Sequence, residues 1–159
     1  MALWDFSVVC PGAEWALYAG LGLRREERYA WWWTVVARVG EPLLLVRDDT
    51  LALPKSNALE VRGSGLWADL HCHEPMQRWQ VNFEGFALAL DPSDVGGDER
   101  GEPVAIEFEF EWDGVAAPTS SAGGGYEQVC MVDGEIQIGP GGPVLSLAEP
   151  VIGWRSERP

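Results

Sequence analysis

Apolar and polar residues alternate along several short stretches of the chain. The clearest stretch, Val104–Asp113 (VAIEFEFEWD), carries bulky apolar residues at every second position and mostly acids between them. A period of two places successive side chains on opposite faces of a β-strand. The stretch therefore predicts a strand with one buried face and one acidic, solvated face. Met76–Phe83 shows the same alternation.

The 19 glycines and 11 prolines divide the chain into short segments, as turns between strands do. Connections this short cannot hold crossover helices, so neighbouring strands should pair antiparallel. The expected strands are Trp4–Cys10, Glu14–Leu23, Arg28–Val39, Leu43–Leu53, Ala58–Arg62, Leu66–His73, Met76–Phe83, Phe86–Leu90, Val104–Trp112, Tyr126–Val132, Glu135–Ile138 and Val144–Leu147. We therefore predict one all-β domain over residues 1–159, a closed or nearly closed antiparallel barrel.

One expected strand, Arg28–Val39, is apolar on both faces. Its outer face then needs cover, from a second copy of the chain in a homodimer, from a packed helix or from the N-terminal segment. Two polar, glycine-rich loops are expected at Asp91–Glu102 and Ala116–Gly125, either beside a pocket mouth or as solvated connections.

Composition narrows the classes of function. The nine tryptophans indicate a wide pocket for a lipophilic small molecule, although a tryptophan-rich core would use them as well. A net charge of −14 argues against nucleic acid and membrane-surface partners. No apolar run is long enough to span a membrane, and no signal peptide is evident, so we predict no membrane insertion. Three scattered cysteines indicate reduced thiols and a cytoplasmic location.

Several segments together resemble a known family. These are HEPMQRWQVNFEG (His73–Gly85), VAIEFEFEWDGVAAP (Val104–Pro118) and GYEQVCMVDGEIQIG (Gly125–Gly139). They are similar to the calycin-like proteins that include carotenoid 1,2-hydratases, AttH-type proteins and natural-product cyclases and Diels–Alderases. The resemblance implies a lipocalin-like β-barrel with an internal apolar pocket. Members usually carry two such domains, and PVIGWRSERP (Pro150–Pro159) stands where the second would begin. Trp154 and Arg155 are interpreted as its remnant.

The two histidines, His71 and His73, are one residue apart, so on a strand they share a face with Asp69 and Trp67. Three interpretations follow. The group is a general acid and base, a metal-ligand pair, or simply the solvated side of a strand whose other face is buried. Without a third histidine or a cysteine cluster the metal interpretation is weak, and we predict no metal and no cofactor.

A fourth candidate acid is Glu127, which shares a strand face with Val129 and Met131. Buried there, its pKa would rise and it could protonate an alkene or carbonyl. At a strand end it would instead meet solvent or pair with Arg78. We also expect Arg78 and Trp79 to form a buried ion-pair or cation–π element.

These observations favour a small cofactor-independent enzyme that holds a polyene-, polyketide- or isoprenoid-like substrate for cyclisation, cycloaddition or hydration. His71, His73, Glu127 and Asp69 are its candidate catalytic residues. The candidate substrate-binding residues are aromatic: Trp31, Trp33, Trp67, Trp79, Tyr126, Phe108 and Phe110. The alternatives are a non-catalytic, lipocalin-like carrier of a hydrophobic molecule and a subunit whose tryptophan strand contacts a protein partner.

Overall fold

The computed structural model describes residues 1–94 and 100–159, so part of the loop expected at Asp91–Glu102 lies outside the described residues. The strands are β1 (Ala2–Val9), β2 (Trp15–Arg24), β3 (Tyr29–Arg38), β4 (Leu43–Leu51), β5 (Leu59–Arg62), β6 (Leu66–Glu74), β7 (Arg78–Leu90), β8 (Glu102–Gly114), β9 (Thr119–Ser120), β10 (Tyr126–Ile138), β11 (Val144–Ser146) and β12 (Val151–Arg158). Two short 3-10 turns, η1 (Pro11–Ala13) and η2 (Pro92–Asp94), accompany them. In the described chain no helix has the length and apolarity that a membrane span requires.

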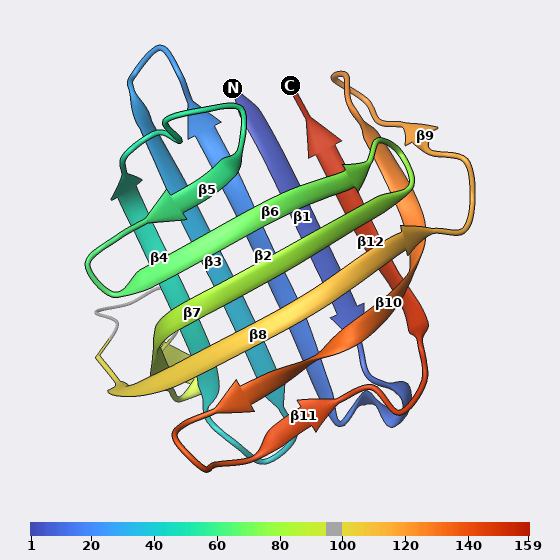
Figure 1. The fold of residues 1–159 in the computed structure, drawn as a ribbon. Coiled ribbons are helices and arrows are strands. Elements are labelled where there is room, and N and C mark those ends of the chain that lie inside the picture. Colours follow the sequence, from blue (N-terminus) through green and yellow to red (C-terminus); the bar gives the residue numbers. More distant parts are fainter. Residues whose placement is uncertain (95–99) are drawn as a thin grey trace.

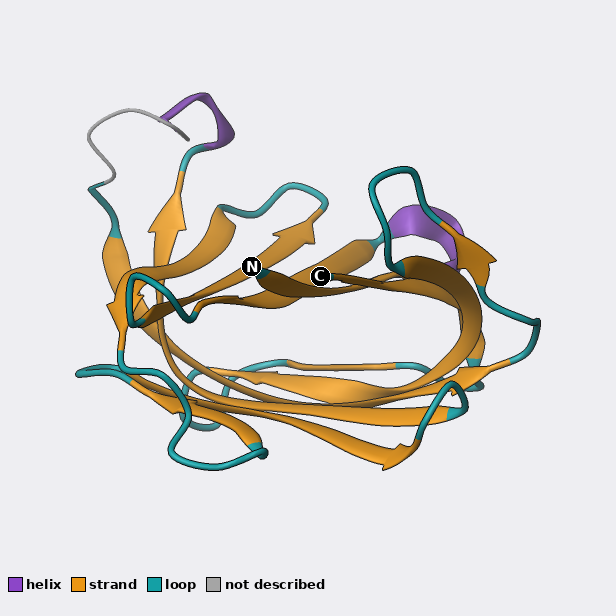
Figure 2. Ribbon diagram, turned by 90° about the horizontal axis from the view of Figure 1, so that it is seen from above, coloured by secondary structure: helices purple, strands orange, loops and turns teal. Residues whose placement is uncertain are grey.

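Hydrogen bonds join eight of the strands into a closed antiparallel ring in the order β1-β2-β3-β4-β7-β8-β10-β12 and back to β1. The ring is flattened into two layers whose strands cross (Figures 1 and 2). β4, β3, β2, β1 and β12 form the back layer, and β6, β7, β8 and the far part of β10 form the front layer. The expected all-β antiparallel architecture is confirmed.

The narrowest joint in the ring is between β4 and β7, where only Leu43–Leu45 pair with Leu88–Leu90. β7 is long enough to pair with β6 along its first part and β4 at its end. The expected break at Gly85 is wrong, because β7 continues through it. The Phe86 backbone N–H donates to the Gly65 carbonyl (3.0 Å), and a Cβ at Gly85 would lie only 2.6 Å from that oxygen. Glycine serves here as a close approach within a strand, not as a turn.

The side chains of β8 alternate between the interior and the outer face, as the sequence pattern predicts. Phe108 and Phe110 are almost completely buried, whereas Glu109 between them is exposed. β10 likewise continues through Gly134, where a turn was expected, and its buried residues lie on the same face before and after that glycine.

The C-terminal segment is a central strand of the back layer. β12 pairs with β1 along Leu3–Val8 and with β10 along Tyr126–Val132. The interpretation of Trp154 and Arg155 as the remnant of a second domain is therefore corrected. The sequence reasoning missed this strand because WRSER has no bulky apolar face, and the interior position is taken by an arginine.

On the outer face of β3, the side chains of Trp31 and Trp33 lie over the neighbouring strand β2 and stay partly exposed. They pair across the strands with Gly22 and Gly20. A Cβ on Gly22 would lie 2.0–2.3 Å from three successive atoms of the Trp31 six-membered ring, which is possible only beneath the ring face. Each indole thus lies flat on a glycine, which has no side chain to hold it off the backbone.

A methyl group at Gly22 should therefore lift the Trp31 ring and expose it. For Gly22→Ala we expect a loss of about 1–3 kcal/mol in the free energy of unfolding, the usual range for overpacking. The matched control is Gly65→Ala, whose new Cβ would meet its nearest atom at 3.9 Å. Urea unfolding followed by tryptophan fluorescence measures both. Equal free energies of unfolding for the wild type and Gly22→Ala would show that the flat contact of Trp31 on Gly22 contributes nothing to stability.

Candidate functional site

The interior between the layers is occupied by aromatic side chains. Trp32 stacks on Phe83 at 5.9 Å between ring centroids, and Phe83 stacks on Phe108 at 5.2 Å. Phe110 and Trp112 continue this row along β8. The structure thus places the candidate substrate-binding residues Phe108 and Phe110 in the packed core. Two grooves lie instead over outer faces, one on the front layer and one on the back layer.

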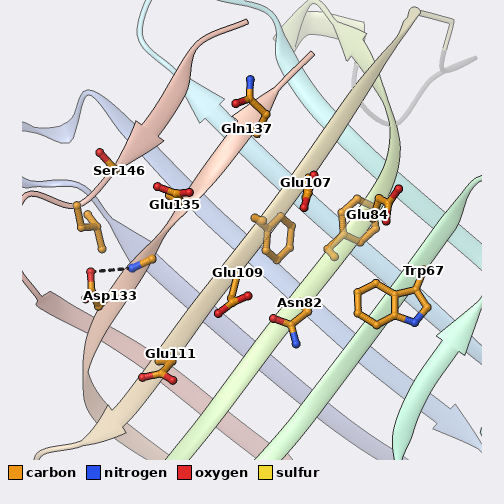
Figure 3. A pocket seen from close by; sticks show the side chains of 14 residues that line it. Trp67, Asn82, Glu84, Glu107, Glu109, Glu111, Asp133, Glu135, Gln137 and Ser146 are labelled. Atoms are coloured by element: carbon orange, nitrogen blue, oxygen red, sulfur yellow. Dashed lines mark hydrogen bonds between the residues drawn. The ribbon is translucent and has the colours of Figure 1, made fainter. Parts of the chain in front are cut away.

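A groove of about 830 Å³ runs over the outer face of β7, β8 and β10 (Figure 3). Trp67 borders it at one side, as Figure 3 shows. Six carboxylates line it: Glu84, Glu107, Glu109, Glu111, Asp133 and Glu135. Several of these acids face one another directly across neighbouring strands, an arrangement that costs stability. Among the described residues, no three or more His, Cys, Asp or Glu side chains are grouped to hold a metal ion.

The histidine pair lies on the outer face of the front layer. His71 and His73 are exposed, their ring centroids are 4.4 Å apart, and Nε2 of His73 is 2.8 Å from Oε1 of Gln80. Asp69 and Trp67 share this face, whereas Leu66, Ala68 and Leu70 are buried on the other. The sequence pattern did not decide which face of this strand points inward. The structure places the histidines on the side away from the interior.

Glu127 is exposed on the outer face of the back layer and does not pair with Arg78. Arg78 instead donates from Nε to Asp113 at 2.6 Å. The expected cation–π element with Trp79 exists, but with a different cation: the guanidinium of Arg155 lies 5.6 Å from the ring centroid. The four candidate catalytic residues are therefore divided between two outer faces, and the structure does not bring them together.

Sequence reasoning missed the most unusual polar group of the interior, Arg155, which is only 2% exposed. Its position on β12 points inward, and its guanidinium lies between the rings of Trp79 and Tyr126. Nε and Nη2 donate to Oε1 of Gln128 at 2.9 and 2.6 Å, and Nη1 donates to the Tyr126 hydroxyl at 2.8 Å. Tyr126 in turn donates to Glu157 at 2.9 Å.

Gln128 fixes the arginine from the opposite side. Its Nε2 donates to the backbone carbonyls of Met76 (3.0 Å) and Ala116 (2.8 Å), which turns Oε1 toward the guanidinium. Within residues 1–94 and 100–159, no ion pair includes Arg155. A buried cation is therefore held by neutral acceptors, with its nearest acid reached only through Tyr126.

Three indole N–H groups around this cluster also have no partner. In the described chain, Nε1 of Trp4, Trp79 and Trp112 is buried and makes no hydrogen bond. Trp4 pairs across the strands with Glu157, and Nε1 of Trp112 is 3.3 Å from where a Cβ on Gly153 would lie. Buried donors without an acceptor are costly and rare in folded proteins. Together with Arg155 they form an interior that is rich in donors.

The cluster lies at one end of the ring, which we call the mouth, where β6 ends and β7, β10 and the chain itself begin (Figure 1). Tyr126, Glu157 and Cys72 are only partly buried there, so the donors are close to solvent. Burial raises the pKa of the Cys72 thiol and leaves it protonated. Burial, followed by the hydrogen bond to Glu157, raises the pKa of Tyr126 to about 12. The phenol is thus a donor at neutral pH, not a base.

The chain matches the family described as Domain of unknown function (DUF7064) over residues 4–152, and it belongs to this family. No curated protein and no solved structure matches the chain. The family description assigns no chemistry, so a functional interpretation rests on the geometry of the residues.

Glu157 should control the titration of Tyr126. For Glu157→Gln we expect the pKa of Tyr126 to fall from about 12 toward its ordinary 10.0, because the carboxylate no longer repels the phenolate. Phenolate absorbance, with Tyr126→Phe subtracted to isolate this tyrosine, measures the shift. Glu127→Gln, on the opposite face of β10, is the matched control and should leave it unchanged. An unchanged pKa in Glu157→Gln would remove the carboxylate from this network.

The same shift sets the sign of a pH effect on stability. The pKa of Tyr126 is higher in the folded chain than its ordinary value of 10.0. Its contribution to stability is therefore complete below about pH 10 and is lost as the pH rises through about 12.

Proposed function

We propose that this protein binds a lipophilic small molecule bearing a carboxylate or carbonyl group, and that Arg155 at the mouth holds the polar group. The ligand enters beside Tyr126 by displacing packed side chains, and its apolar part then lies on the buried aromatic rings of Trp79 and Phe6. The ring of strands would then act as a calycin- or lipocalin-like barrel, as the sequence resemblance implies. The observation that carries this proposal is the buried guanidinium without a directly bound acid.

The energetic argument begins with the charge. Arginine stays ionised in proteins, and burying an ion without a counter-ion costs several kcal/mol even after relaxation. Gln128 and Tyr126 recover part of that cost through neutral hydrogen bonds. A ligand carboxylate would recover more, because hydrogen bonds between charged partners are shorter and stronger. The indole N–H groups of Trp79 and Trp112 supply further donors for the same group.

The aromatic surroundings suit the remainder of such a ligand. Phe6 lies 6.1 Å from Trp79 and 5.0 Å from Trp112, centroid to centroid, and pairs across the strands with Arg155. An apolar chain held by its polar end at Arg155 would pack against these rings as it enters, and burial of its surface would supply most of the binding free energy. The carrier function needs no further group.

A cyclisation, cycloaddition or hydration is the second candidate function. The feature that favours it is the guanidinium of Arg155 at the mouth, which would polarise a ligand carbonyl. The pKa of Tyr126 near 12 keeps the phenol protonated, and its hydroxyl would donate to the ligand by turning away from Glu157. The reaction needs no cofactor in this scheme, because the site supplies orientation and polarisation.

Binding should depend on the acid group of the ligand. We expect wild-type protein to bind palmitic acid and retinoic acid more tightly than hexadecanol and retinol, as measured by tryptophan fluorescence quenching. Arg155→Gln should weaken binding of the acids by about ten- to a hundredfold, the range for hydrogen bonds to a charged group, and abolish the preference. Arg62→Gln, which removes the same charge from an exposed site, should change nothing.

Three controls keep this experiment decisive. Circular dichroism tests whether Arg155→Gln is folded. If it is not, Arg155→Lys replaces it in the experiment, because lysine retains the charge. Equal affinities of the wild type for acids and alcohols would contradict the proposal. Mass spectrometry of each incubated ligand separates carrier from enzyme. A product lost in Arg155→Gln supports catalysis at the mouth, whereas a product lost only in His71→Ala/His73→Ala would place it on the outer face.

A further inference from the structure

A second candidate site lies on the outer face of the back layer, away from the mouth interior. We propose that it binds a neutral carbohydrate chain, with one sugar ring held between Tyr18 and Trp154 and further rings lying along Trp33 and Trp31. A pocket of about 270 Å³ opens between the first two aromatic side chains. Its proposed ligand differs from that of the interior site, and the two sites share only Arg155, whose guanidinium is bound to Gln128 and Tyr126.

The pocket follows from the strand register. Tyr18 on β2 pairs with Ser7 on β1, and Ser7 pairs with Trp154 on β12. A small residue thus stands between two large aromatic ones across three adjacent strands. Two strand spacings separate the backbones of the aromatic residues by roughly 9–10 Å. That gap accommodates one ring-shaped group with an aromatic wall on each side.

The polar groups of the pocket come from the neighbouring row of the same layer. The register joins Gly20, Asp5, Ser156 and Glu127 in order across β2, β1, β12 and β10. Asp5, although it points outward, is only 8% exposed. It accepts hydrogen bonds from the Tyr18 hydroxyl (2.8 Å) and Ser156 (3.0 Å) and pairs with Arg158. This network fixes the Tyr18 wall in place.

Two hydrogen-bonding groups of the pocket remain available. Within the described residues, the side chains of Ser7 and Glu127 form no hydrogen bond, and both line the pocket. A hydroxyl group and a carboxylate placed beside aromatic faces complement a sugar ring, whose edge carries hydroxyl groups and whose faces present C–H groups. Trp154 is 54% exposed, so most of its indole is free to contact a ligand.

The aromatic surface continues from the pocket along β3. The ring centroids of Tyr18 and Trp33 are 6.1 Å apart, and Trp33 and Trp31 follow at 6.4 Å with an interplanar angle of 21°. Both indoles lie flat on glycines and are partly exposed, and the guanidinium of Arg24 lies 5.9 Å from the Trp31 ring centroid. Tyr29 extends the row, 6.2 Å from Trp31. The strip has the shape of a platform for successive flat rings.

Charge selects among possible ligands. Glu127 at the pocket and the net charge of −14 disfavour an anionic chain. A cation would have to approach Arg158, which already neutralises Asp5. A neutral, hydroxyl-rich chain meets neither obstacle. The flat indoles of Trp31 and Trp33 offer a planar surface on which sugar rings can stack.

Cellohexaose and maltohexaose are suitable neutral probes, with oligogalacturonate as the anionic comparison. We expect at least one neutral hexaose to bind saturably in calorimetry and to shift the indole N–H resonances of Trp154 and Trp33. Trp154→Ala should weaken binding about tenfold, the magnitude of one aromatic contact. Phe86→Ala removes an equally exposed ring that lies outside this pocket and should have no effect. Tyr126→Phe, a variant of the mouth at a residue that does not line this pocket, should also bind the hexaose normally.

Several results would overturn the proposal. The neutral-carbohydrate site would be disproved if both hexaoses failed to bind. It would also be disproved if Trp154→Ala left the affinity unchanged, or if oligogalacturonate bound equally well. A wild-type dimer in sedimentation velocity that Trp154→Ala dissociates would show that the surface is an interface between copies of the chain. If the wild-type protein binds a hexaose but no fatty acid, only the interior site is disproved. The two proposals can therefore fail separately.

Discussion

The pairing of β12 between β1 and β10 is the contact on which the closed ring and both candidate sites depend. Alternate residues of this strand face opposite ways. Arg155 and Glu157 point into the mouth, whereas Trp154 and Ser156 point to the outer face. A slip of one residue in its register would exchange the two sets, placing an indole in the polar cluster and a guanidinium in the outer pocket. One strand therefore positions two chemically different surfaces.

Glycine on neighbouring strands gives the aromatic residues their places. On the outer face, Gly20 and Gly22 let indoles lie flat against β2. In the interior, Gly153 leaves room for the Trp112 ring, which reaches across from β8 to β12. The many tryptophans thus occupy four environments: a packed core, a donor-rich mouth, an exposed platform and, for Trp67, the border of the acidic groove. The composition is explained by these separate demands more fully than by one large apolar pocket.

Much of the ring could be predicted from alternation, because a strand with one buried face repeats every two residues, as Val104–Asp113 does. The end strand could not, since its inward positions carry Gly153 and Arg155, which the pattern treats as polar. The continuation of β7 and β10 through Gly85 and Gly134 was equally hidden, because glycine marks turns far more often than close approaches. One readable signal was overlooked: Gly-x-Gly before a tight turn and Trp-x-Trp after it indicate indoles lying on glycines.

The candidate sites show why single-strand patterns identify chemistry poorly. His71, His73 and Asp69 share a face by spacing alone, yet that face is the solvated one. The mouth combines residues from six strands, and Gln128 reaches Arg155 only through the pairing of β10 with β12. Such a cluster has no sequence spacing to detect. The cluster is recognised by its energetic cost instead. A buried cation and indole N–H groups without acceptors are costly, and that cost is removed where a ligand acceptor binds.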